Sequence, residues 1–495
     1  MNSSAPASSR EQHLHPIGML LEALQTLRRW FGVAAFPGIA ALINGEFGVR
    51  ILLFVLLGVA LLGILSAVWG VLSWRATSYL VSGGALHLKR GVFQKSERSL
   101  PLEHVQSVSS VQGIVQRLFD VVEVRVETAG GGGEPEISLS ALSRSDAEAL
   151  REELTSTRRA SLEDFEEPAP AVLRRLSVRD LLLAGLTSGQ IGIAASVVLG
   201  ASQTVDQLLP RNLAKQISEA LLPQTVWAAL LLVLAIVVFA WVLAILGTVL
   251  AHANFTLSRS VDGKYLHIKR GLLKRYEATV PLARIQAIKI VEGVLRQPFG
   301  LATLRVESAG FGAEEGVSTT LFPLLPRKKV EKLLRATAPR FAGPLDDLKP
   351  LPARARRRYA FRAVLPVLPI SAFCAVFYFL PGLVSLLVML PAALYGLLRY
   401  RAAGRRLDGD RLVLRFRRLA RTTVILPGER LQSRGYSVSP LQRRNELATL
   451  EVEVASGRGG VAFRLVDLEA EMAGNLVEAL AERGSRAASQ ERYSV

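Results

Sequence analysis

Five stretches of this chain carry no charged side chain, and they constrain its fold more than any other feature. Ile51–Trp74, Leu181–Thr204 and Val226–Ala251 are each long enough to cross a bilayer as a helix, which takes about 20 apolar residues. Trp30–Gly45 is shorter and contains Pro37, so a tilted span, a thin span and a re-entrant segment all remain open. The chain is therefore predicted to be an integral membrane protein.

The fifth stretch, Ala363–Leu398, is too long for a single span. As one helix it would measure roughly 54 Å, at a rise of about 1.5 Å per residue. Pro381 and Gly382 lie near its middle, and this dipeptide favours a turn. We therefore expect two short helices here, and about six transmembrane helices in three hairpins over the whole chain.

Basic residues indicate how these hairpins are oriented, because Lys and Arg near the ends of spans are retained on the cytoplasmic side. The formal net charge is +18, and many of the basic side chains flank the outer ends of the hairpins. The turns within the hairpins carry only Arg50, Arg211 and Lys215. Both termini and all large soluble segments are therefore predicted to be cytoplasmic.

The soluble segments are related by an internal repeat. LHLKRG, PLEHVQSV and VQGIVQRLFDVVEVRVETAG in the first copy recur as LHIKRG, PLARIQAI and VEGVLRQPFGLATLRVESAG in the second, 180 residues later. A third copy is more diverged: LPGERLQS and LATLEVEVASG follow the second copy by 146 residues. Apolar and polar residues alternate in these segments, as in half-buried strands, and a helical pattern closes each copy.

These motifs resemble the bacterial pleckstrin-homology-like (PH-like) domain of the YdbS/YdbT membrane proteins, and the arrangement resembles that of their three-domain members. The resemblance covers nearly the whole chain after about residue 15. It implies three PH-like β-sandwich or barrel domains, each with a C-terminal helix, in a bacterial cell membrane. It also implies a role in the cell envelope or in tolerance of membrane-active agents, and a hetero-complex with a shorter single-domain relative.

The resulting division of the chain has ten parts. They are a tail (1–29), a first hairpin (30–74), a first PH-like domain (75–157), a linker (158–180), a second hairpin (181–251), a second PH-like domain (252–340), a basic linker (341–362), a third hairpin (363–398), a third PH-like domain (399–485) and a tail (486–495).

Clusters of basic residues in the strands and in the last linker are the candidate contacts with anionic lipid headgroups. They are Lys89, Arg90, Lys95, Lys269, Arg270, Arg275, Arg415, Arg417, Arg356, Arg357 and Arg358. A solvated strand face is the alternative for the strand residues, and positive-inside anchoring alone is the alternative for the linker residues.

No pattern in the sequence indicates catalysis. It has no nucleophile elbow, no phosphate-binding loop and no metal-ligand spacing, and its single cysteine, Cys374, excludes an intramolecular disulfide. We therefore expect a non-enzymatic scaffold or interaction protein at the inner leaflet, without cofactor, metal or nucleic acid. A component that handles or transports lipids or small molecules through the six helices is the competing hypothesis, although the spans contain no charged residue.

Overall fold

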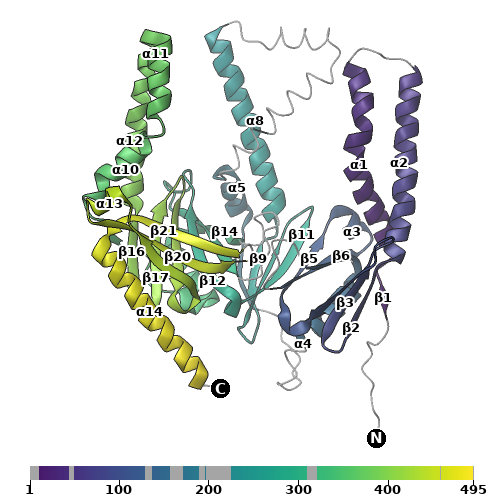
Figure 1. The fold of residues 1–495 in the computed structure, drawn as a ribbon. Helices are drawn as coiled ribbons and strands as arrows, with labels where there is room; N and C mark the ends of the chain where they lie inside the picture. The colour runs from purple at the N-terminus through teal and green to yellow at the C-terminus, as the bar shows by residue number, and fades with distance from the viewer. Residues whose placement is uncertain are drawn as a thin grey trace.

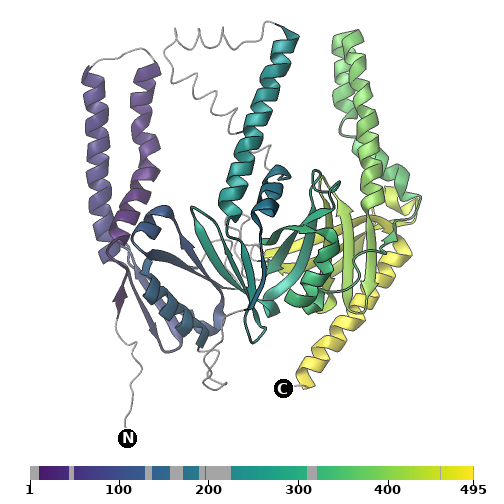
Figure 2. The same ribbon diagram turned by 180° about the vertical axis from the view of Figure 1, so that it is seen from behind.

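The computed structural model describes residues 11–43, 49–128, 136–156, 171–188, 196, 225–308, 320–456 and 459–493. Long helices project from one side of a row of β domains, in three separate groups (Figures 1 and 2). This layout places all three helix groups in a position to enter the same membrane.

The three helix groups follow one another along the chain. They are α1 (Gly18–Ile43) with α2 (Val49–Arg75), α5 (Val178–Leu186) with α8 (Val226–His252), and α10 (Ala355–Val364) with α11 (Leu368–Val384), the 3₁₀ turn η5 (Ser385–Val388) and α12 (Met389–Ala402).

Two of the described helices are long and apolar enough to cross a membrane, namely Leu53–Arg75 and Val226–His252. A third candidate is the pair Ala355–Val364 and Leu368–Phe377, which is bent by 44°. Large apolar side chains on these helices are uncovered by protein; Trp227, for example, is 78% exposed. Such surface is compatible with lipid and not with water. The expectation of six spans is therefore supported for two or three helices among the described residues.

The third helix group contains a chain reversal. The hydroxyl of Ser371 donates to the carbonyl oxygen of Ser385 at 3.2 Å, and the hydroxyl of Ser385 donates to the carbonyl oxygen of Ser371 at the same distance. Residues 14 positions apart can meet in this way only if the chain folds back between them. The predicted reversal is thus present, within the segment that includes Pro381 and Gly382.

Within the residues that the structure describes, each β domain has seven strands and a closing helix. Copy one has β1 (Gln12–His13), β2 (Ser78–Ser82), β3 (Ala85–Arg90), β4 (Ser96–Pro101), β5 (Val105–Gln112), β6 (Val121–Thr128), β7 (Ile137–Ser143) and α4 (Arg144–Ser156). Copy two has β8 (Ala171–Arg175), β9 (Thr256–Arg259), β10 (Tyr265–Arg270), β11 (Arg275–Pro281), β12 (Ile285–Glu292), β13 (Leu301–Ser308), β14 (Thr320–Pro326) and α9 (Arg327–Thr337). Copy three has β15 (Lys349–Pro350), β16 (Gly404–Asp408), β17 (Arg411–Arg417), β18 (Arg421–Pro427), β19 (Leu431–Ser437), β20 (Leu447–Ser456), β21 (Gly459–Glu469) and α14 (Ala470–Tyr493).

The strands confirm the register of the repeat. The equivalent strands β3 and β10, and likewise β5 and β12, begin 180 residues apart, and β12 and β19 begin 146 residues apart. The PH-like interpretation of the soluble segments is consistent with these sheets.

The division into domains needs correction at the start of each copy. The first strand of each copy precedes its helix group: β1, β8 and β15 lie before the helices and pair with β2, β9 and β16 after them. Most of the tail 1–29 that is described is therefore structured, as β1 and the start of α1, and the linkers 158–180 and 341–362 supply β8, β15 and α10. The C-terminal tail 486–495 also changes, because α14 continues to Tyr493.

The three copies share their sheets. Strands β5 to β7 of copy one and β8 to β11 of copy two form one seven-stranded sheet, joined by β5 and β11. Strands β12 to β14 and β15 to β18 form a second, joined by β12 and β18. A four-stranded sheet of β1 to β4 and a three-stranded sheet of β19 to β21 lie at the two ends. The domains are therefore one continuous array rather than three separate modules.

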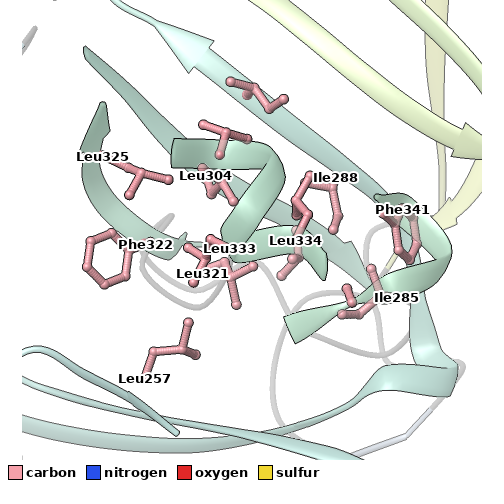
Figure 3. Packing of buried hydrophobic residues seen from close by; sticks show 14 of the residues in the cluster. Leu257, Ile285, Ile288, Leu304, Leu321, Phe322, Leu325, Leu333, Leu334 and Phe341 are labelled. Atoms are coloured by element: carbon pink, nitrogen blue, oxygen red, sulfur yellow. The ribbon is translucent and has the colours of Figure 1, made fainter. Parts of the chain in front are cut away.

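The apolar core follows the same continuity. In copy two, Leu304, Phe322 and Leu334 converge with their neighbours around α9 (Figure 3). Val413 and Ile425 of copy three belong to this same buried cluster and are 0% exposed. The core of the second domain is thus completed by the third.

Candidate functional site

The turn between the third and fourth strands of each copy, which carries the KRG motif in copies one and two, packs against a helix that leads away from the β layer. In copy one the ring of Phe93 lies 6.0 Å from that of Trp69 on α2. In copy two the backbone N–H of Leu272 donates to the carbonyl oxygen of Leu250 on α8 at 3.0 Å. In copy three the hydroxyl of Tyr395 on α12 donates to the carbonyl oxygen of Arg418 at 2.7 Å. These turns therefore lie on the helix side of the array.

Glycine is required in this turn in the first two copies. Gly91 has φ 119° and Gly271 has φ 100°, a region that side chains with a Cβ rarely adopt. A Cβ atom would also lie 2.0 Å from the carbonyl oxygen of Gln94 or of Lys274, respectively. The backbone of the turn thus accounts for the glycine of the KRG motif.

The loop between the fifth and sixth strands lies on the same side. It holds α3 (Ile114–Leu118) in copy one and α13 (Pro440–Arg443) in copy three. In copy two, Arg296 donates from Nη2 to the carbonyl oxygen of Ala184 on α5 at 3.2 Å. In copy three, Arg358 of α10 donates to the carbonyl oxygen of Leu441 at 2.8 Å. These loops therefore also lie at the base of the helices.

Exposed apolar side chains gather on these turns and loops. Phe93 is 89% exposed, Leu118 79% and Phe299 71%. We call the set the apolar rim; it consists of Phe93, Ile114, Leu118, Phe119, Leu272, Leu273, Val294, Leu295, Phe299, Leu419 and Leu441. Large apolar side chains concentrated on one side of a protein mark a surface that contacts something other than water.

The basic residues expected to contact lipid differ in exposure and in their partners. Lys95, Arg275, Arg356 and Arg357 are exposed. Lys89, Arg90 and Lys269 are about half exposed, and each has an acidic partner: Glu11 at 2.5 Å, Glu22 at 3.5 Å and Glu277 at 3.1 Å, respectively.

The other four residues are held by protein groups. Arg270 is 4% exposed and stacks over the ring of Tyr276 at 5.1 Å. Arg415 donates to the carbonyl oxygen of Leu345 at 2.7 Å, and Arg417 donates to the side chain of Gln297. Burial lowers the pKa of both Arg415 and Arg417 from the usual arginine value. Their positions favour a structural role over a lipid contact.

Arg358, the eleventh residue, belongs to a buried ionic cluster that the sequence did not indicate. Asp467 is 0% exposed and accepts hydrogen bonds from Arg358 Nε at 3.2 Å, Arg362 Nη2 at 3.0 Å and Gln442 Nε2 at 2.8 Å. The hydroxyl of Tyr359 donates to the backbone next to it, at Val466, at 3.0 Å. The basic helix α10 is thus bound to the third domain by its inward face.

The junction between copies one and two is polar. Arg151 of α4 donates from Nη2 to the hydroxyl of Thr279, and lies 3.4 Å from Nδ1 of His267. Gln112 of β5 is paired with Arg275 of β11 in the shared sheet.

The junction between copies two and three is apolar at its centre and ionic at its edge. Leu334 of α9 shares a buried cluster with Val413 and Ile425. The carboxylate of Glu292 has a side chain 1% exposed, forms an ion pair with Arg421, and lies 3.5 Å from Arg327. Neither junction was predicted from the sequence.

Among the described residues, no group of three or more His, Cys, Asp or Glu side chains is placed to hold a metal ion. His13, which forms an HxH pair with His15 in the sequence, lies in β1 with its ring 6.4 Å from that of Trp74.

Comparison with known proteins identifies the family to which these domains are similar. A model of the family described as Bacterial PH domain matches residues 31–158, 208–340 and 364–483. The UPF0699 transmembrane protein YdbT of Bacillus subtilis (strain 168) is 31% identical over 465 residues, which is 90% of this chain and 93% of that protein. No solved structure gives a significant match. The resemblance inferred from the motifs and the threefold repeat are both confirmed.

Proposed function

Because this chain belongs to the bacterial PH domain family, with three copies of that domain in a transmembrane protein, we propose that it is a non-enzymatic scaffold whose PH-like array lies against the inner leaflet. The observation that carries the proposal is the apolar rim, whose turns and loops contact the bases of all three helix groups. A role in envelope maintenance or in tolerance of membrane-active agents follows from the resemblance.

The proposed topology has six spans in three hairpins, with both termini and the array in the cytoplasm. The excess of Lys and Arg at the outer ends of the hairpins supports this orientation. The test uses single cysteines in a Cys374→Ser background and a membrane-impermeant maleimide. Gly382→Cys, within the third chain reversal, should react in intact cells, whereas Arg464→Cys on β21 should react only after permeabilisation. Equal labelling of Arg464→Cys in intact cells would contradict the orientation.

Rim side chains are proposed to enter the headgroup region, with the exposed basic residues Lys95, Arg275, Arg356 and Arg357 beside anionic lipid. Apolar contact and electrostatic attraction reinforce each other at such an interface, with about 1 kcal/mol per basic side chain near an anionic surface. Exposed residues carry this role better than the seven that have protein partners. A single-domain relative as a partner in a hetero-complex also remains part of the proposal.

Lipid contact can be measured by fluorescence quenching in reconstituted liposomes. A tryptophan placed by Phe93→Trp should be quenched by lipids brominated on their acyl chains, beyond the background from native tryptophans. Val261→Trp is the matched control, because Val261 is 54% exposed but lies in the turn between β9 and β10, at the far end of β9 from α8. Equal quenching at the two positions would contradict the proposed contact.

A further inference from the structure

Two strands at opposite ends of the array have one free edge each. In the part of the chain that the structure describes, β4 is the last strand of the four-stranded sheet, and β19 is the last strand of the three-stranded sheet. A free edge presents a row of backbone N–H and C=O groups that can pair with another strand.

The same two edges are occupied elsewhere in the chain. Strands β11 and β18 are the equivalents of β4, and strands β5 and β12 are the equivalents of β19. Pairing follows one register at both junctions: Gln112 lies opposite Arg275, and the equivalent residues Glu292 and Arg421 lie opposite each other. The fold therefore uses the same strand pairing at both internal junctions. At each end of the array, one strand of the kind that takes part in this pairing, β4 or β19, is left at a sheet edge.

We propose that β19 of one molecule pairs with β4 of a second copy of this chain, head to tail, in the register of the internal junctions. The internal offsets place Ser437 opposite Ser96, and Val438 opposite Lys95. The interface continues the existing one, with the same strands and the same polarity, so it is a β-strand addition between identical arrays.

The exposure of the two strands supports this assignment. Ser96 to Ser99 of β4 are all exposed, whereas most residues of the paired strands β11 and β18 are covered. Polar composition does not prevent such pairing. Strand β5 has the sequence VQSVSSVQ and is joined to β11, with Ser109 2% and Gln112 8% exposed. The polar strands β4 and β19 are therefore of a kind that this fold already pairs.

A second, independent feature is the surface beside β4. At the first internal junction Arg151 of the closing helix lies against His267 and Thr279 on the third and fourth strands of the next copy, and at the second junction Leu334 shares a buried cluster with Val413 and Ile425. The equivalents in copy one are His87 and Ser99. His87 there lines an open pocket, together with Glu11, Ser78, Tyr79, Leu80, Ser82, Lys89 and Glu97.

Helix α14 supplies the group that would cover this pocket. Its buried residues Ala473, Leu476 and Leu480 have the spacing of Ala147, Leu150 and Leu154 in α4. That spacing places Val477 at the position that Arg151 has in α4. Val477 of one molecule would thus face the pocket of the next at the position that Arg151 occupies at the first internal junction.

The membrane imposes no conflict on this assembly. All three helix groups leave the array on one side, although they belong to successive copies joined by the same step (Figures 1 and 2). Another step of the same kind keeps the helices of the added molecule on that side. A head-to-tail interface of this type generates a closed ring or an extended filament.

Disulfide trapping tests the register in full-length protein with Cys374→Ser. Two differently tagged variants, Ser96→Cys and Ser437→Cys, are reconstituted together in liposomes and mildly oxidised. We expect a covalent dimer that contains both tags, and none from either variant alone. Ser433→Cys is the matched control, since it is an exposed serine on the same strand. Four residues along a strand is roughly 13 Å. A disulfide tolerates a Cα separation of only about 7 Å, so this control should give at least about tenfold less dimer.

Three results in liposomes would overturn the proposal, and a fourth result could come from intact cells. The first three are the absence of a mixed dimer, an equal yield from the Ser433→Cys control, and a dimer from Ser96→Cys alone, which would indicate a symmetric edge. Trapping of a different protein on Ser437→Cys in intact cells, in place of a second copy, would also overturn it. All three positions are exposed serines, and Ser→Cys changes the side-chain volume little. The variants should therefore fold, and a negative result would count against the proposed pairing.

Discussion

Asp467 and Arg358 form a contact between two parts of the chain that are more than 100 residues apart: Arg358 Nε donates to Asp467 Oδ1 at 3.2 Å. Asp467 lies on the last strand of the third domain, and Arg358 lies on the helix that leads into the third hairpin. The contact is buried on the aspartate side and is shared with Arg362. It fixes the third domain to its membrane helices.

The first prediction concerns this cluster. Asp467→Asn keeps the shape of the side chain but leaves Arg358 and Arg362 without their negative partner. Removing one partner of a buried ion pair costs about 3–5 kcal/mol, and we expect a value near the lower limit because Arg362 is 38% exposed. The apparent Tm of the detergent-solubilised protein should fall. Glu478→Gln on the exposed side of α14 is the control, and an equal effect of the two substitutions would contradict the prediction.

The second prediction compares the two internal junctions. Glu292→Gln removes the negative charge that pairs with Arg421 and lies near Arg327. The variant has glutamine at this position, as the first junction already has in Gln112. We expect a loss of about 1–3 kcal/mol, the cost of leaving a buried charged donor poorly satisfied. In the Glu292→Gln variant, hydrogen–deuterium exchange of the backbone amides should be faster in β12 and β18, at the second junction, than in β5 and β11, at the first. Uniform exchange across all four strands would show that the pair does not hold the junction.

Much of the fold could be predicted because its signals are local. Alternation with a period of two marks β3 and β6, and the fixed offsets between copies place their equivalents. The first strands escaped prediction because β1 and β15 have only two residues each, too few to show alternation. Their partners also lie beyond a helix group, as in the pairing of Gln12 with Tyr79.

The shared sheets could not be predicted for a different reason. The alternation of apolar and polar residues in β5 determines which side chains face inward. The same alternation would be seen whichever strand lay beside β5, so it does not identify β11 as the partner. The same limit applied to the linker arginines. Arg356, Arg357 and Arg358 are adjacent in the sequence, yet α10 turns Arg358 and Arg362 towards Asp467 and leaves the other two exposed. Arg358 can be told apart from Arg356 and Arg357 only when the bounds of α10 and the position of Asp467, far along the chain, are known.

A third prediction follows from Tyr276, which lies on β11 at the first junction. Burial raises the pKa of its hydroxyl to about 12. The unfolded chain has a tyrosine pKa of about 10, so the folded state retains the proton more strongly. Stability from this group is complete below pH about 10 and is lost as the pH rises towards about 12.

The measurement is the apparent Tm between pH 9 and 11.5 for wild type and Tyr276→Phe. Phenylalanine has no proton to lose, so the variant should show a shallower decline, with a difference that reaches about 2 kcal/mol at pH 11.5, at about 1.36 kcal/mol per pH unit above the unfolded pKa. Tyr436→Phe, at a side chain that is 50% exposed, controls for the titration of lysines and arginines elsewhere. Parallel curves for wild type and Tyr276→Phe would contradict the assignment.

The last prediction separates backbone strain from steric conflict in the KRG turn. Gly91→Ala places a Cβ at φ 119° and 2.0 Å from the carbonyl oxygen of Gln94, so the turn must open. Gly83→Ala is the matched control, because Gly83 has φ 59° but no atom within 4 Å of the position that a Cβ would take there. Left-handed strain alone costs about 1–2 kcal/mol, so Gly83→Ala should show a loss of that size. Gly91→Ala should lose clearly more, and should also release Phe93 from Trp69, which is measurable as a change in tryptophan fluorescence. If both variants unfold at the same temperature with the same emission, the steric conflict does not set the conformation of the turn, and the position of Phe93 at the base of α2 must depend on other contacts.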